Sequence, residues 1–174
     1  MTKGSLKRGA SIALAGVLFA SWPVPAPAQT PIRIGASLSV TGTYAKPGTQ
    51  QKEGYDVCVD ELNAKGGLLG RKVEFVVYDD QSMPATAVKL YEKLITEDKV
   101  DAVMGPYSSA VSEAVANVTE KYKKVMVAPL AATTSIFKKG RKYIFMVISP
   151  ARVYPDGLVG MGGKRGPETV ALIN

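Results

Sequence analysis

Residues 73–105, VEFVVYDDQSMPATAVKLYEKLITEDKVDAVMG, are the stretch that decides the fold. Apolar runs from Val73 to Tyr78 and from Val100 to Met104 have the length of buried strands. Between them, Ser82 can cap a helix and Pro84 suits its first turn. The core-facing positions of that helix share one face and are Ala87, Val88, Tyr91, Leu94 and Ile95. A single amphipathic helix between two strands predicts parallel pairing through a right-handed crossover.

The same alternation continues on both sides of this unit. Strands are predicted at Ile32 to Leu38, Val125 to Ala128 and Tyr143 to Ile148. The preceding helix has one apolar face, predicted to be buried, made of Tyr55, Cys58, Val59 and Leu62. The helix after residue 105 is marked by Val111, Ala114, Val115, Val118 and Tyr122. We therefore predict an α/β fold with a doubly wound parallel sheet and helices on both faces.

Such a sheet binds ligands in a crevice at the carboxyl ends of its strands. Four loops are expected at that edge, namely Ser39–Gly48, Asp79–Met83, Gly105–Ser109 and Pro129–Ser135. The first of these loops contains Pro47 and is expected to separate the first strand from the helix that follows it. Candidate functional residues are therefore expected in these loops.

Two neighbouring loops offer hydroxyls and accessible backbone. Ser108 and Ser109 directly precede a helix, whose free N–H groups and positive end could hold a carboxylate. Either serine could instead simply cap its own helix. After the fourth strand, the small residues Ala131 and Ala132 let a ligand approach the main chain, and Thr133 adds a hydroxyl.

Two further features of these loops each allow two interpretations. Asp79 and Asp80 could suggest a metal site or an acid pair, but carboxylates after a strand more often brace the following turn, and we favour that role. Tyr44 could stack on a ligand or cover the edge of the crevice.

The composition argues against an enzyme and against a nucleic-acid binder. The chain has no histidine and one cysteine, Cys58, so His-containing catalytic arrangements and His-rich metal sites are excluded; we expect no metal and no cofactor. No phosphate-binding glycine motif is present. The formal charge is +7, but the basic residues are scattered, and the group Lys138, Lys139, Arg141 and Lys142 is interpreted as a solvated turn.

The two ends of the chain predict export and a further unit. Lys3, Lys7 and Arg8 precede an apolar run at residues 11–20, and Ala26-Pro27-Ala28 matches a signal-peptidase site. Residues 1–28 are therefore expected to be a cleaved signal peptide rather than a membrane anchor, because the apolar run is shorter than the ~20 residues that span a bilayer. A helical segment around 152–163 and a strand at Thr169–Ile173 are expected to begin a second unit that continues beyond Asn174.

An ordered set of motifs resembles one family. The chain is similar to the periplasmic leucine/isoleucine/valine-binding proteins of branched-chain amino-acid ABC importers. The matching segments are Ile34-Gly35-Ala36-Ser37-Leu38-Ser39-Val40-Thr41-Gly42, Asn63-Ala64-Lys65-Gly66-Gly67-Leu68-Leu69-Gly70, Tyr78-Asp79-Asp80, Gly105-Pro106-Tyr107-Ser108-Ser109 and Ala128-Pro129-Leu130-Ala131-Ala132-Thr133.

The resemblance implies a two-lobed receptor that closes on an amino-acid-like ligand. It implies a ligand-binding first lobe at residues 31–148, and a crossover with the incomplete start of a second lobe at 149–174. It also implies a periplasmic, monomeric protein that serves a membrane permease. A signalling receptor of the same fold and an inactive truncated fragment are the alternatives.

The same resemblance implies which residues bind the ligand. Its ligand serine corresponds to Ser109, and its backbone and threonine contacts to Ala131 and Thr133. The additional residue Leu130 allows the backbone contact to shift to Ala132. Where the family often has an aromatic residue in the first loop, this chain has Pro47. The full candidate set comprises Ser109, Ala131, Thr133, Ser108, Tyr44 and Tyr107.

Overall fold

The computed structural model describes residues 29–165 of the 174-residue chain. The expected signal peptide at residues 1–28 and the expected strand at Thr169–Ile173 lie outside the described residues. Within the described part, no helix combines the length and the apolar character needed to cross a bilayer.

The described chain is built on one five-stranded parallel sheet. Its strands are β1 (Ile32–Leu38), β2 (Val73–Asp79), β3 (Ala102–Met104), β4 (Met126–Ala128) and β5 (Ile144–Met146), in the spatial order β2-β1-β3-β4-β5. Because β1 lies between β2 and β3, the strand order reverses beside it, which is where doubly wound sheets form their ligand crevice. The predicted fold class is confirmed.

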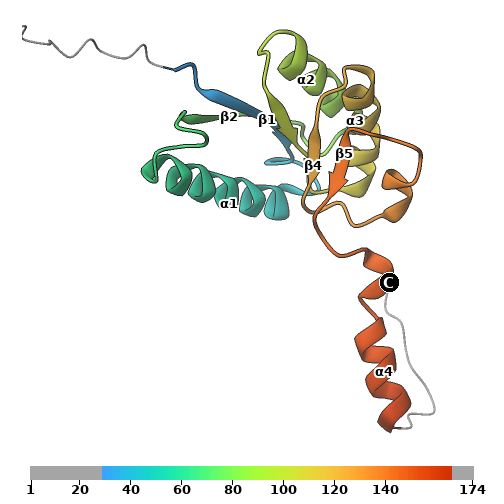
Figure 1. The fold of residues 1–174 in the computed structure, drawn as a ribbon. Helices are drawn as coiled ribbons and strands as arrows, with labels where there is room; N and C mark the ends of the chain where they lie inside the picture. The colour runs from blue at the N-terminus through green and yellow to red at the C-terminus, as the bar shows by residue number, and fades with distance from the viewer. Residues whose placement is uncertain (1–28, 166–174) are drawn as a thin grey trace, which may run out of the picture.

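Three helices cover the sheet unequally. The helices α2 (Pro84–Thr96) and α3 (Ser109–Lys121) pack side by side on one face, and α1 (Ala45–Ala64) lies on the other face beneath β1 and β2 (Figure 1). The core lies under α2 and α3, and its fully buried members include Tyr91, Leu94, Val103, Val115 and Met126. The sequence prediction that α2 presents Tyr91 and Leu94 to the core is thus confirmed.

Helix α1 differs from its prediction in two respects. It begins at Ala45 and contains Pro47, which its first turn tolerates because an N–H there has no helical partner to lose. Cys58 is exposed, so the prediction that it is buried is wrong. Helix α1 contacts the sheet through Gln51 and Tyr55. The Tyr55 ring meets the Phe75 ring edge-on, with the ring centroids 5.1 Å apart. Cys58 lies to the side of this contact.

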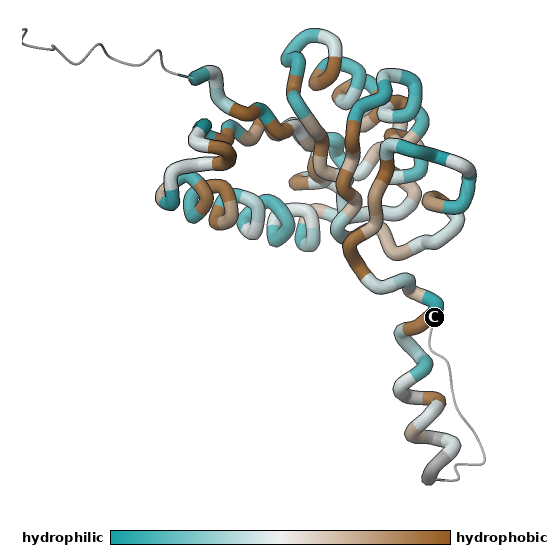
Figure 2. Tube along the Cα trace, viewed as in Figure 1, coloured by the Kyte–Doolittle hydropathy of each residue, from teal (hydrophilic) through white to brown (hydrophobic). Residues whose placement is uncertain are grey.

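Among the described residues, no helix covers the half of the α1 face that β4 and β5 form (Figure 1). Val125 is 41% exposed, Phe145 53% and Val147 70%. These residues alternate with the buried Met126 and Ile144, so they point to the face opposite α3. Figure 2 shows the apolar colouring that continues along β4 and β5. Parallel sheets are normally covered on both faces, so this half-face is an unusual surface.

The segments after β4 and β5 are short. A 3-10 turn, η1 (Thr134–Phe137), follows β4, and a second one, η2 (Ala151–Val153), leads from β5 to α4 (Asp156–Arg165). The helix predicted around residues 152–163 is therefore present, and it extends away from the sheet (Figure 1).

Arg141 ties the approach to β5 onto α3. Its side chain is 7% exposed, donates to Glu113 at 2.6 Å and to Asn117 at 2.7 Å, and also donates to the carbonyl of Ile136 at 2.9 Å. The interpretation of this basic group as wholly solvated is therefore wrong for Arg141. Arg141, followed by Lys139, lowers the pKa of Glu113 from 4.5 to about 2.

The Glu113→Gln variant is expected to lose stability in a pH-dependent way. Because the folded pKa of Glu113 lies below its ordinary value, its ion pairs stabilise the fold above about pH 4.5, and this contribution disappears as the pH falls toward 2. Unfolding free energies from urea titrations should therefore differ between wild type and variant at pH 6 and converge near pH 2. Glu92→Gln, at an exposed pair with Lys121, is the control and should show little difference. A gap for Glu113→Gln that stays constant with pH would contradict this account.

Candidate functional site

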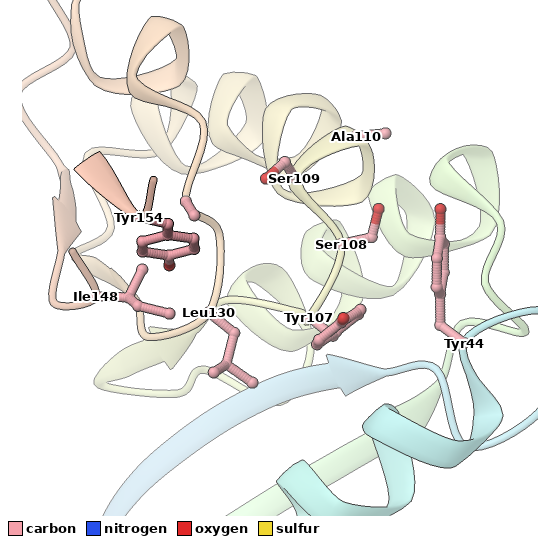
Figure 3. Close-up of a pocket in the computed structure, with 9 residues that line it drawn as sticks. Tyr44, Tyr107, Ser108, Ser109, Ala110, Leu130, Ile148 and Tyr154 are labelled. Carbon is pink, nitrogen blue, oxygen red and sulfur yellow. The ribbon is translucent and has the colours of Figure 1, made fainter. Parts of the chain in front are cut away.

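A pocket of about 550 Å³ opens at the carboxyl ends of the strands. Figure 3 shows Tyr44, Tyr107 and Ser108 on one side of it, and Leu130, Ile148 and Tyr154 on the other. Ser109, Ala110 and Ala132 complete the lining. No charged side chain is among these residues, so backbone dipoles, hydroxyls and apolar contacts are the means by which this lining can hold a ligand.

The predicted residues are brought together in part. Tyr44, Tyr107, Ser108 and Ser109 line the pocket. In the next loop, Ala132 lines it, whereas the side chain of Ala131 is fully buried. Thr133 is exposed and is not among the lining residues, although it is adjacent to Ala132.

The start of α3 faces this space with groups that are free to bind. Ser108 is the N-cap residue, yet its side chain makes no capping hydrogen bond. Only 6% of Ser108 is exposed as a residue, but its hydroxyl oxygen is not among the buried unpaired polar atoms of the described residues, so the oxygen itself is accessible from the pocket that Ser108 lines. The alternative that Ser108 caps its own helix is therefore not what the structure shows. An accessible hydroxyl that makes no capping bond, beside the positive end of a 13-residue helix, suits a carboxylate ligand.

Tyr44 and Tyr107 form an aromatic wall, a name we use for this pair. Their ring centroids are 5.8 Å apart and their planes are tilted by 51°. Tyr107 is 37% exposed, so part of its ring is open to solvent. Tyr44 comes from the loop after β1 and Tyr107 from the loop after β3, which are neighbouring strands. The wall can therefore contact the apolar part of a small ligand.

Asp79 and Asp80 brace the loops, as predicted. Asp80 is fully buried and accepts hydrogen bonds from the hydroxyls of Ser37 at 2.8 Å and Ser39 at 2.6 Å, and from the backbone N–H of Ser82 at 3.0 Å. Among the described residues, no cluster of His, Cys, Asp and Glu could hold a metal ion. Asp80 thus joins the ends of β1 and β2 into one rigid edge.

Asp79 fastens the loop that follows β1. Its carboxylate accepts from the Thr41 hydroxyl at 2.6 Å and from the backbone N–H groups of Gln81 at 2.9 Å and Thr41 at 3.3 Å. Burial acts to raise the pKa of Asp79, but the hydrogen bonds from Thr41 and Gln81 outweigh it and hold that pKa below its ordinary value. The charged form is therefore the one that fits this loop.

Ser82 does not cap α2, so that prediction is wrong. The N-cap residue is Met83, and Ser82 has a left-handed backbone with φ of 64°. Its hydroxyl instead accepts from the backbone N–H of Tyr44 at 3.0 Å and donates to the carbonyl of Thr41 at 2.9 Å. Ser82 therefore connects the β2–α2 loop to the loop that carries Tyr44.

Gln51 on α1 supports the loop that carries Tyr107, the second residue of the aromatic wall. Its amide nitrogen donates to the carbonyl of Gly105 at 2.9 Å and to the Tyr55 hydroxyl at 2.8 Å. Gly105 lies two residues before Tyr107, so α1 holds the base of the loop that carries the second ring. Burial raises the pKa of Tyr55 to about 12, which keeps its hydroxyl protonated throughout the physiological range.

Sequence reasoning missed four lining residues as ligand contacts, namely Ala110, Leu130, Ile148 and Tyr154. Ala110 follows the two predicted serines, Leu130 lies in a predicted loop, and Ile148 and Tyr154 follow β5. The signal was present, because a fifth parallel strand must end at the same edge of the sheet as the other four.

Comparisons with known proteins place this site in a family. The family model described as periplasmic binding protein matches residues 31–174. The chain belongs to the periplasmic binding protein family. Among the curated relatives of this family member, the Leu/Ile/Val-binding protein BraC3 of Rhizobium johnstonii is 35% identical over 127 residues, which cover 73% of this chain and 34% of the relative.

Further relatives agree with this assignment. The leucine-, isoleucine-, valine-, threonine-, and alanine-binding protein of Pseudomonas aeruginosa is 32% identical over 139 residues, which cover 80% of this chain and 36% of the relative. This periplasmic binding protein family member thus spans about a third of the length of the curated relatives it matches. The relatives carry the names of binding proteins, in agreement with the expectation that the chain is not an enzyme.

Solved structures give the same result for the fold. The branched-chain amino-acid transporter substrate-binding protein LivJ of Streptococcus pneumoniae, solved with isoleucine, matches with a TM-score of 0.67 and 32% identity, covering 70% of this chain and 34% of that one. The leucine-binding protein LivK of Thermotoga maritima matches with a TM-score of 0.68 and 27% identity, covering 77% and 37%. The resemblance seen in the sequence motifs is therefore confirmed.

Proposed function

We propose that this chain is the first ligand-binding part of a periplasmic receptor that captures an amino acid or a related small carboxylate for an ABC importer. The observation that carries the proposal is the Ser108 hydroxyl, which makes no capping hydrogen bond and lies beside the start of α3, in a pocket whose lining has no charged side chain. The uncompensated partial positive charge at that helix start favours an anionic group.

The division of roles within the pocket follows from its two sides. Ser108, Ser109 and the backbone around Ala131 and Ala132 would hold the polar end of the ligand, with Thr133 adding a hydroxyl as the ligand is enclosed. Tyr44, Tyr107 and Tyr154 would contact its apolar end. We infer that closure of a second lobe completes the site and that the closed state is presented to a membrane permease.

Isothermal titration calorimetry of the full-length receptor, second lobe included, tests this proposal. The panel comprises L-leucine, L-isoleucine, L-valine, L-alanine, L-phenylalanine and benzoate. We expect heat of binding for at least one carboxylate and none for L-leucinamide, which lacks the anionic group. Equal heats for L-leucine and L-leucinamide would contradict capture at the helix start, and no heat for any panel member would contradict the proposed function.

Export is expected to remove residues 1–28. When the 174-residue chain is expressed in a bacterium with two membranes, intact-mass spectrometry of the periplasmic fraction should give a chain that begins at Gln29. Ala28→Phe, which replaces the small residue at the cleavage site, should retain the uncleaved mass. Recovery of the wild type only as the uncleaved chain in the cytoplasm would contradict a periplasmic location.

A further inference from the structure

The aromatic wall is held by a contact from outside the pocket lining. Tyr44 lies at the start of α1, and its backbone N–H donates to the Ser82 hydroxyl at 3.0 Å. The same hydroxyl donates to the carbonyl of Thr41 at 2.9 Å. Ser82 therefore contacts both ends of the short segment 41–44, while it is itself absent from the lining of the pocket.

Ser82 is held in place by buried groups. Its backbone N–H donates to Asp80 at 3.0 Å, and Asp80 is anchored by the hydroxyls of Ser37 on β1 and Ser39 just after it. A chain of hydrogen bonds thus runs from the sheet through Asp80 and Ser82 to the backbone of Tyr44. Asp80 directly follows β2, and Ser82 lies two residues further along the same loop.

The two loops are packed too closely for this contact to be incidental. A side-chain Cβ at Gly42 would lie 2.4 Å from the carbonyl oxygen of Gln81 and 2.8 Å from the Ser82 hydroxyl. Gly42 itself has φ of 82°, a backbone conformation that residues with a side chain rarely adopt. Ser82 and Gln81 also adopt left-handed backbones, with φ of 64° and 56°. Non-glycine residues in that region are uncommon and need support from their surroundings.

We propose that Ser82 is a positioning residue for ligand selectivity: by holding the Tyr44 backbone, it sets the Tyr44–Tyr107 pair as the wall against which the ligand's side chain packs. The selectivity part rests on the proposed function. A ligand with a large apolar side chain reaches this wall, whereas one held only by its carboxylate does not need it. The contribution of Ser82 should therefore grow with the size of the ligand's side chain.

The variants Ser82→Gly and Gln81→Gly form a matched pair. Both introduce glycine at a left-handed position and relieve the same kind of backbone strain, but only Ser82→Gly removes the hydroxyl that binds Tyr44. Both should therefore keep a thermal midpoint close to that of the wild type. A difference between them reports the hydroxyl and not the backbone.

Two NMR measurements test the positioning. In Ser82→Gly, hydrogen exchange at the Tyr44 amide should become at least about tenfold faster, since the exchange rate follows the loss of the protecting hydrogen bond. The nuclear Overhauser contacts between the Tyr44 and Tyr107 rings should also weaken. In Gln81→Gly, both should match the wild type. Unchanged exchange and unchanged ring contacts in Ser82→Gly would overturn the proposal.

Calorimetry with L-leucine and L-alanine tests the selectivity. Ser82→Gly should weaken L-leucine binding about tenfold, the loss expected for one aromatic contact, and L-alanine binding about twofold or less. Equal losses for the two amino acids would overturn the selectivity role. If neither amino acid binds the wild type, the selectivity role is overturned together with the proposed function for these ligands, while the NMR result still decides the positioning of Tyr44.

Discussion

The Ser109→Asp variant is expected to lose carboxylate binding by about 100-fold or more while its fold stays as stable as the wild type or gains stability. Ser109 is the first residue of α3 and lines the pocket. A carboxylate in the first turn stabilises a helix, because it meets the positive end of the dipole. The same charge in the pocket repels an anionic ligand, and like charges in contact cost several kcal/mol of binding.

The opposite signs of these two effects make the experiment decisive. Ala85→Asp is the matched control, because Ala85 is an exposed residue in the first turn of α2 and is absent from the pocket lining. It should give a similar gain in thermal midpoint with unchanged binding. Calorimetry with the best ligand of the carboxylate panel and thermal unfolding by circular dichroism supply the two readouts. Full binding by Ser109→Asp would show that the carboxylate is held elsewhere.

The Asp80→Ala variant is expected to lower the free energy of unfolding by about 3 kcal/mol or more. It leaves two buried donors, on Ser37 and Ser39, and a partly buried one on Ser82 without their acceptor, and an unsatisfied buried group costs about 1–3 kcal/mol. It also separates the ends of β1 and β2 from the loop that carries Tyr44. Urea unfolding followed by far-ultraviolet circular dichroism measures the loss.

Asp79→Ala is the control for that variant. Asp79 precedes Asp80 in the chain and also accepts three hydrogen bonds, but its donors lie in loops at the surface of the molecule. Water can replace the lost acceptor there, so the destabilisation should be about 1 kcal/mol. Equal losses for the two variants would mean that burial of Asp80 adds nothing to its role.

The long elements could be predicted from the sequence because their signal is periodic. The bounds of β1 were predicted correctly, and the parallel order followed from the alternation of strands and helices. The short strands were predicted to be too long, as at Val100, because an apolar run continues beyond the residues that pair in the sheet. Hydropathy records burial, and Val100 is buried without being part of β3.

The site was predicted only where a feature is local in sequence. Ser108 and Ser109 were found because a helix start is visible in the residues that follow it. The role of Ser82 could not be found in this way, since its left-handed backbone depends on Asp80 and on the approach of Gly42 from another loop. Cys58 was misplaced for a related reason: helical periodicity identifies an apolar face but not how much of the sheet is there to cover it.

The uncovered half of the sheet has a thermodynamic consequence for the described part of the chain. Val125, Phe145 and Val147 are already partly hydrated before the protein unfolds, at 41%, 53% and 70% exposure. Unfolding therefore hydrates less additional apolar surface than in a domain of the same length whose sheet is covered on both faces. Both the heat capacity change and the denaturant m-value scale with that added surface, so this domain should have a flatter stability curve and a shallower urea transition.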